Sequence, residues 1–241
     1  MKENRFLLPT IILSIAILLS VLLFSGTWKK VRSTDQTINV TGSAKKLIVS
    51  DLAVIRGNLN AEAGTAKEAY QKLQSQKPIL LAYLAKQGFN EKDIDFKTTN
   101  SYPNYYYNNN GMQTGIRSYT INQMIEFQSK DVEKMKKLSI DITSLVEQGV
   151  EFAVNPPEYY YTKISDIKID VQAEAAKDAM IRGRSIAEAT GRTLGTLKSA
   201  RMGVLQITPE NSNITSDYGV NDVSSIRKEI TAVVNANFEI E

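Results

Sequence analysis

Few residues of this chain have the types and the spacing that catalysis needs. Ser43 and Lys46 fit the S-x-x-K pattern, in which a lysine assists a nucleophilic serine. The companion S-D-N and K-T-G motifs of serine-acylating enzymes are missing, and Ser43 is expected in a turn between two strands rather than at a helix start. A cell-wall or small-molecule hydrolase that uses Ser43 with Lys46 is therefore the weaker of two functional hypotheses.

Two pairs of carboxylates could act as an acid and a base, or bind a hard cation. These pairs are Asp93 with Asp95 and Asp166 with Asp170. Asp93 fits better in the turn before a strand, and Asp166 fits a helix N-terminus, where negative charge is favoured. The structural interpretation is preferred, and we predict no catalytic, cofactor-binding or metal-binding residue.

The composition narrows the chemistry further. The chain of 241 residues contains no cysteine and no histidine. This excludes disulfides, thiolate metal sites, a lipid-modified cysteine and both Ser-His and Cys-His catalysis, and it removes most zinc, copper and haem ligation. The net charge of +3 comes from 29 basic and 26 acidic residues, which gives little support for nucleic-acid binding. We therefore predict a protein that is not an enzyme and has no nucleic-acid partner.

Two runs of tyrosine are the most unusual polar-aromatic feature. Consecutive tyrosines on a strand point to both faces, so some of them lie outside the core. They could pad two extended segments against each other, form a protein interface, where tyrosine is enriched, or stack on a glycan or a nucleic acid. The candidate interaction surface consists of Tyr105, Tyr106, Tyr107, Tyr159, Tyr160 and Tyr161, with Tyr102 just before the first run.

An uninterrupted apolar run precedes everything else. It starts at Leu7, ends at Phe24 and contains no charge. As a helix it spans about 27 Å, close to the hydrocarbon thickness of a bilayer. Ser25, Gly26 and Thr27 would allow signal cleavage after Thr27, whereas Trp28 suits the membrane interface of a retained anchor. We predict a transmembrane anchor over residues 1–32, with secretion after cleavage as the alternative.

The flanking charges bear on orientation. Lys2 and Arg5 precede the run, and Lys29, Lys30 and Arg32 follow it. The positive-inside rule alone would leave the following domain in the cytoplasm, by a difference of one charge.

Hydrophobic periodicity and turn residues define the elements that carry these residues. The tip between two long strands is expected at Asn108, Asn109, Asn110 and Gly111, and Pro78 is expected to kink or split its helix. The buried side of the last helix is predicted to be alanine-rich, and it is therefore expected to pack closely on a sheet. Its residues are Val171, Ala175, Ala179, Ile186 and Ala189. Strands are predicted over residues 37–42, 47–60, 94–107, 116–127, 150–154, 197–208 and 224–240, and helices over 65–87, 132–149 and 166–190.

This order of elements predicts an α+β fold of antiparallel sheets packed with helices. A long helix ending at a glycine and followed by two strands occurs at 65–127 and again at 166–240. We therefore expect two similar halves within one domain, residues 33–241.

Short motifs follow one another at characteristic spacing in the same region. They are INVTGSA at 38–44, SDLA at 50–53, YTINQ at 119–123, EQGV at 147–150, AAKDA at 175–179, RGRSIA at 182–187 and GRTLG at 191–195. By the order and spacing of these motifs, about residues 36–240 resemble the SIMPL domain family, also called DUF541. Ala44 stands where the family usually has a glycine.

The resemblance implies an α+β domain commonly exported to the bacterial envelope, with no agreed catalytic residues. Some family members are linked to oligomeric assembly or to stress phenotypes. We therefore expect a single-pass protein of the bacterial inner membrane whose domain faces the periplasm, and this expectation outweighs the charge count. Its preferred function is non-enzymatic: self-assembly, or binding to an envelope protein, with a role in envelope stress as one option.

Overall fold

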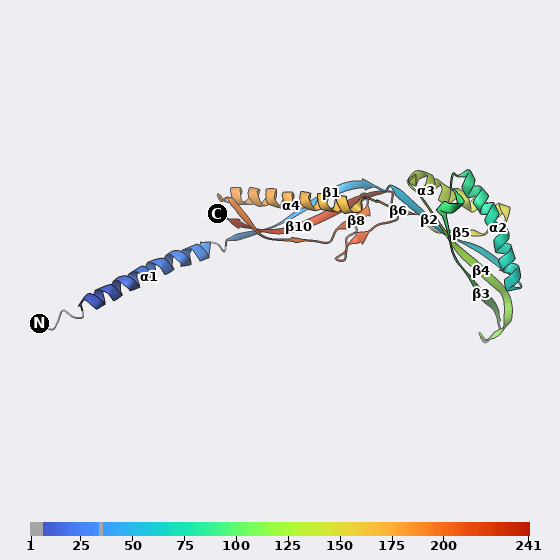
Figure 1. The fold of residues 1–241 in the computed structure, drawn as a ribbon, viewed down its shortest axis with the longest axis horizontal. Coiled ribbons are helices and arrows are strands. Elements are labelled where there is room, and N and C mark those ends of the chain that lie inside the picture. Colours follow the sequence, from blue (N-terminus) through green and yellow to red (C-terminus); the bar gives the residue numbers. More distant parts are fainter. Residues whose placement is uncertain (1–6, 34–35) are drawn as a thin grey trace. The chain divides into compact units, whose positions relative to one another are not determined.

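The computed structural model describes residues 7–33 and 36–241 as one apolar helix and an α+β fold with two sheets (Figure 1). The chain divides into two compact units. Unit 1 comprises the described residues of Met1–Lys45 together with Asp166–Leu205 and Thr231–Glu241, and unit 2 comprises Lys46–Ser165 and Gln206–Ile230. The region predicted as a single domain thus contains two units, each with segments distant in sequence.

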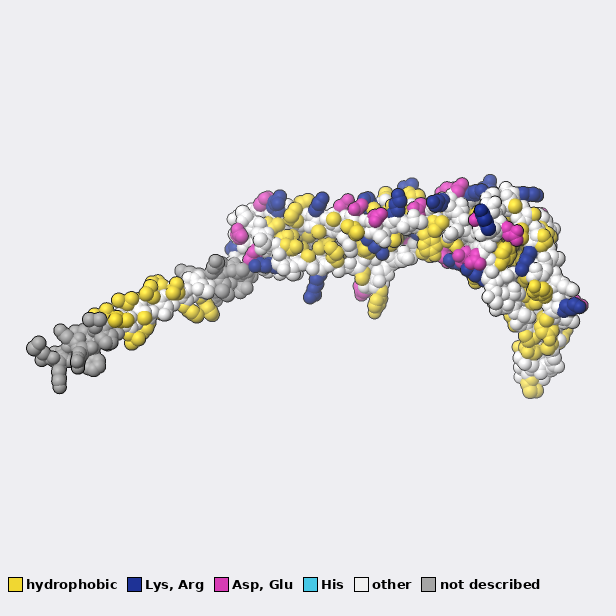
Figure 2. Space-filling view, viewed as in Figure 1, with side chains coloured by type: hydrophobic (Ala, Val, Ile, Leu, Met, Phe, Trp, Pro, Cys, Tyr) yellow, Lys and Arg dark blue, Asp and Glu magenta, His cyan; other side chains and the backbone are white. Residues whose placement is uncertain are grey.

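Helix α1 (Leu7–Ser33) contains the predicted anchor. From Thr10 to Trp28 its mean hydropathy is 2.3 and none of it is buried, so it is long and apolar enough to cross a membrane. Hydrophobic side chains cover this part of the helix (Figure 2). Lys2 and Arg5 lie outside the described residues, as do the side chains of Lys29, Lys30 and Arg32.

Unit 2 is built on an antiparallel sheet with the strand order β3-β4-β2-β5, in which β6 also pairs with β2. Its helix α2 (Ala66–Lys86) begins at a capping box formed by Thr65 and Glu68. The strands are β2 (Leu52–Ala63), β3 (Ile94–Tyr107), β4 (Gln113–Ser129), β5 (Phe152–Val154) and β6 (Glu158–Tyr160), and the other helices are η2 (Glu91–Asp93), α3 (Val132–Asp141) and η3 (Ile142–Gln148).

The core of unit 2 lies between this sheet and its helices. Alternate residues of β4, namely Ile121, Ile125 and Phe127, are buried against apolar side chains of α2 such as Leu73 and Leu80. The buried positions recur every two residues in the strand and every three to four in the helix, as one-sided burial of each element requires. The expected split at Pro78 is wrong, because α2 runs through this proline as one helix.

The second sheet has the order β1-β10-β8-β9, and β7 also pairs with β10. It consists of β1 (Thr37–Val49), β7 (Leu194–Met202), β8 (Gln206–Pro209), β9 (Val220–Asn221) and β10 (Arg227–Ile240). Helix α4 (Ile164–Ala189) precedes β7 in the sequence. The predicted strand at 197–208 is thus two strands, β7 and β8, and the loop after it contains β9. The short pair β8 and β9 is parallel.

In unit 1, α4 packs very closely on β1. Its buried residues recur every four positions: Val171, Ala175, Ala179, Gly183 and Ala187. A Cβ atom on Gly42 would lie 2.3 Å from both the Ala175 carbonyl oxygen and the Ala179 amide nitrogen. The close packing predicted from the alanines is therefore confirmed. The buried stripe, however, continues through Gly183 and Ala187, whereas Ile186 and Ala189 are exposed.

The predicted break between the first two strands was also misplaced. Strand β1 continues through Ser43 to Val49, and the turn falls at Ser50 and Asp51. The alternation of more and less exposed residues continues without a break through Lys45 and Lys46.

Candidate interaction surface

The hairpin of β3 and β4 presents the first tyrosine run. Its tip is closed by hydrogen bonds from the amides of Asn108 to the Met112 carbonyl (3.0 Å) and of Gly111 to the Asn108 carbonyl (2.9 Å). The side-chain oxygen of Asn108 accepts from the amides of Asn110 and Met112, both at 3.0 Å. Gly111 has φ = 74°, which a glycine adopts without strain. The predicted tip is confirmed.

The sides of this hairpin are apolar and exposed. Tyr106 is 56% exposed and Tyr107 62%, and Met112 and Ile116 are exposed beside them, while Tyr105 is half-buried. No charged side chain occurs between Lys97 and Arg117. Figure 2 shows hydrophobic side chains gathered over this hairpin. Exposed apolar patches of this kind mark interaction sites on soluble domains.

A polar network near the base connects the hairpin to β2. The Asn104 amide donates to the hydroxyl oxygens of Ser118 (2.9 Å) and Thr120 (2.8 Å), and the Ser118 hydroxyl donates to the Glu62 carboxylate. That bond from Ser118, assisted by Arg117, lowers the pKa of Glu62. The bond between Ser118 and Glu62 thus ties β4 to the neighbouring strand β2.

The second tyrosine run lies on and after β6 and is less exposed than the first. Tyr159 is only 5% exposed and belongs to the core of unit 2, and its carbonyl accepts a hydrogen bond from Lys228 Nζ at 2.6 Å. The Tyr160 hydroxyl donates to Glu158, which raises the pKa of Tyr160 and lowers that of Glu158. Tyr159 therefore fills space in the core, and Tyr161 is half-buried.

Lys228 is a feature that the sequence did not reveal. It is 2% exposed, and its Nζ also donates to the Asp222 carbonyl at 2.5 Å. Burial lowers the pKa of this ammonium. The lysine lies within an alternating apolar strand. Only the tertiary structure shows that it connects β10 to a main-chain carbonyl of β6 and to that of Asp222, the residue after β9.

The residues considered for catalysis are not assembled into a site. Ser43 and Lys46 are three residues apart on one strand, so their side chains leave opposite faces. The Ser43 amide donates to Asp178 Oδ2 at 2.8 Å. A lysine on the other face of the strand cannot take the proton of the Ser43 hydroxyl.

The carboxylate pairs are likewise engaged in local structure. Asp93 accepts from the Asn90 side chain at 3.0 Å in η2, and Asp95 binds Lys97 on the same strand. Asp166 and Asp170 lie exposed one turn apart near the start of α4. Among the residues that the structure describes, no group of three or more acidic side chains could hold a metal ion.

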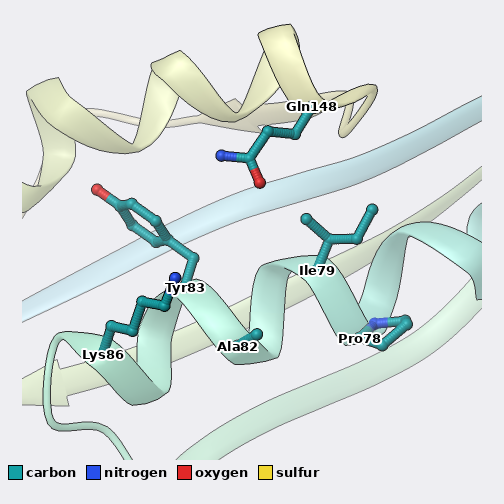
Figure 3. A pocket seen from close by; sticks show the side chains of 6 residues that line it. All are labelled: Pro78, Ile79, Ala82, Tyr83, Lys86 and Gln148. Atoms are coloured by element: carbon teal, nitrogen blue, oxygen red, sulfur yellow. The ribbon is translucent and has the colours of Figure 1, made fainter.

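A pocket of about 340 Å³ lies between α2 and η3 in unit 2. Figure 3 shows Pro78, Ile79 and Ala82 along α2, with Gln148 facing them from the other helix. Burial, together with the negative charge of Asp141, raises the pKa of Tyr83 on the same wall. The pocket therefore offers two neutral hydrogen-bonding groups, Tyr83 and Gln148, and the ammonium group of Lys86 beside an apolar wall.

These features define a class of protein: an α+β domain behind one apolar helix, with an exposed aromatic hairpin and no assembled catalytic centre among its described residues. The model of the SIMPL family, described as "Protein of unknown function (DUF541)", matches residues 38–238. The chain belongs to this family. It is also 24% identical to the "Uncharacterized protein YggE" of Edwardsiella ictaluri (strain 93-146) over 173 residues, which cover 70% of this chain and 69% of that protein.

Proposed function

We propose that this protein is a non-enzymatic, membrane-tethered protein of the bacterial cell envelope that assembles with itself or with an envelope protein. In this proposal α1 stays in the inner membrane as an uncleaved anchor, and the two units face the periplasm. Its exposed hairpin, β3–β4, is the contact surface. The protein would take part in the envelope stress response through the partner that its hairpin binds.

One observation carries this proposal. The hairpin exposes Tyr106, Tyr107, Met112 and Ile116 on a segment without charge. Tyrosine and methionine are enriched in protein interfaces, and tyrosine gives a large contact area for little loss of conformational entropy. The absence of cysteine and histidine from the sequence and the separation of Ser43 from Lys46 support a binding role over a catalytic one.

Light scattering of the full chain in detergent micelles tests the assembly. After subtraction of the detergent, we expect a protein mass above the 26.8 kDa of one chain. Replacing both Tyr106 and Tyr107 by serine should shift this mass toward that of the monomer. Tyr218→Ser is the matched control, since this tyrosine is 97% exposed outside the hairpin. A monomer that the double substitution leaves unchanged would rule out self-assembly through the hairpin.

A further inference from the structure

A second exposed apolar feature lies in unit 1, along the edge of β1. A groove of about 490 Å³ is lined by Asn39, Val40 and Thr41 of β1 and by Ile181, Arg182, Ser185 and Ile186 of α4. Ile181 is 58% exposed and Ile186 47%. These isoleucines lie beside the buried alanine stripe, so they do not serve the packing of α4 on its sheet.

The floor of the groove is a strand edge. Strand β1 stands at the end of its sheet order. The Ser43 amide binds the Asp178 side chain, which shows that this peptide group faces away from β10. Peptide groups of alternate residues face the same edge, so those of Thr41 and Asn39 point into the groove. A tyrosine hydroxyl of a second molecule could bind these peptide groups while its ring contacts the isoleucines.

The charges at the groove cancel. Arg182 is the charged residue of the lining, and its Nε pairs with Asp178 at 2.8 Å. The hairpin surface is also uncharged, because no charged residue lies between Lys97 and Arg117. Two uncharged apolar surfaces can meet without the cost of burying an unpaired ion.

Edge-to-edge pairing of two β3 strands is a poorer alternative. Strand β3 also stands at a sheet edge, but Pro103 lies within it and has no amide hydrogen to donate. Proline on an edge strand blocks pairing with a further strand. The hairpin is therefore suited to contact another molecule through its side chains, whereas the free edge of β1 is suited to bind such side chains.

We infer that the β1–α4 groove of one molecule receives the β3–β4 hairpin tip of a second copy of this chain. This inference rests on the proposed function and names the site that the hairpin binds. The two surfaces are different, so the contact is heterologous, and repetition would produce a ring or an open chain of molecules rather than a closed dimer.

Cross-linking between single-cysteine variants tests this contact, because the natural chain contains no cysteine. Full-length Tyr107→Cys and Ile186→Cys proteins are purified in detergent, mixed, and treated with a short bismaleimide. We expect a product of two chains on denaturing gels at a yield at least tenfold above that of Tyr107→Cys mixed with Ile169→Cys. Ile169 is an exposed residue of the same helix outside the groove. Since each thiol is on a different protein, the product reports only contacts between molecules.

The outcomes separate this inference from the proposal on which it rests. Equal yields with Ile186→Cys and Ile169→Cys would overturn the inference. Strong cross-linking of Tyr107→Cys with itself, together with assembly that depends on Tyr106 and Tyr107, would also overturn it but keep the hairpin as the assembly surface. As a second measurement, Ile181→Lys with Ile186→Lys should shift the full chain toward the monomer in light scattering. Circular dichroism of each variant confirms that the fold is retained.

Discussion

At the residue scale, charged side chains of unit 2 neutralise one another on the sheet. Arg56 donates from Nε to Glu126 at 2.6 Å and from Nη1 to Glu158 at 2.5 Å, and Glu158 also accepts from the Tyr160 hydroxyl. These contacts connect β4, β2 and β6 across neighbouring strands. They raise the pKa of Arg56 and lower that of Glu158.

The Glu158→Gln substitution should change how stability depends on pH. The bonds from Tyr160 and Arg56 lower the pKa of Glu158 below its ordinary value of 4.5. A carboxylate with a lowered pKa stabilises the fold above the unfolded-state value, and this contribution is lost as the pH falls through the folded-state value. We therefore expect Glu158→Gln to lower the melting temperature at pH 7 and to lose most of this effect at the acidic end of a series from pH 7 to pH 3.

Glu147→Gln, which changes an exposed carboxylate in η3, is the control for this series. It should leave the melting temperature close to that of the natural chain across the range. A difference between Glu158→Gln and the natural chain that stays constant down to pH 3 would show that the ionised form of Glu158 is not what stabilises the sheet.

At the scale of elements, the contact between α4 and β1 depends on the absence of a side chain at Gly42. A methyl group there would meet main-chain atoms of Ala175 and Ala179, which cannot move without shifting the helix. We expect Gly42→Ala to lower the free energy of unfolding by about 1–3 kcal/mol, as overpacking of a tight interior does. Denaturation with urea, followed by circular dichroism, measures this change.

Gly115→Ala provides the comparison, since nothing lies within 4 Å of a Cβ atom at that position of β4. It should change the free energy of unfolding much less than Gly42→Ala does. Equal effects at the two sites would mean that α4 adjusts easily, and that its alanine stripe does not require the close approach.

The sequence predicted most of these elements because their periodicity is strong. The strand at 94–107, the helix at 65–87 and the asparagine tip between β3 and β4 agree with the structure within a few residues. The failures occurred where local patterns are ambiguous. The turn expected at Ser43 missed the continuity of β1. Ile186 was predicted to be a core residue because alanine and isoleucine both count as apolar in a helical pattern.

The candidate site was predicted only in part, for a similar reason. Runs of tyrosine indicate that some side chains leave the core, but they do not say which ones. Tyr106 and Tyr107 lie at the end of a hairpin beyond the helices that cover the sheet, whereas Tyr159 is enclosed by elements distant in sequence. The groove at Ile181 and Ile186 could not be predicted, because it needs the edge of β1 and α4 side by side.

At the scale of the whole molecule, the position of the domain relative to the membrane decides which partners are available. Helix α1 is long and apolar enough to span a bilayer, and the charges around it differ too little to fix an orientation. The proposed arrangement places everything after Trp28 outside the cytoplasm. Protein partners and cell-wall material would then be accessible to the hairpin, and cytoplasmic proteins would not.

Protease treatment of spheroplasts from a Gram-negative host that expresses the full chain tests this arrangement. We expect the protein in the membrane fraction, with the residues after α1 digested from outside while a cytoplasmic marker stays intact, because a retained anchor exposes its domain to the added protease. Resistance until the spheroplasts are lysed would place the domain in the cytoplasm and contradict the proposal. A soluble periplasmic product that begins at Trp28, identified by mass spectrometry, would instead show cleavage after Thr27 and replace the tethered protein by a secreted one.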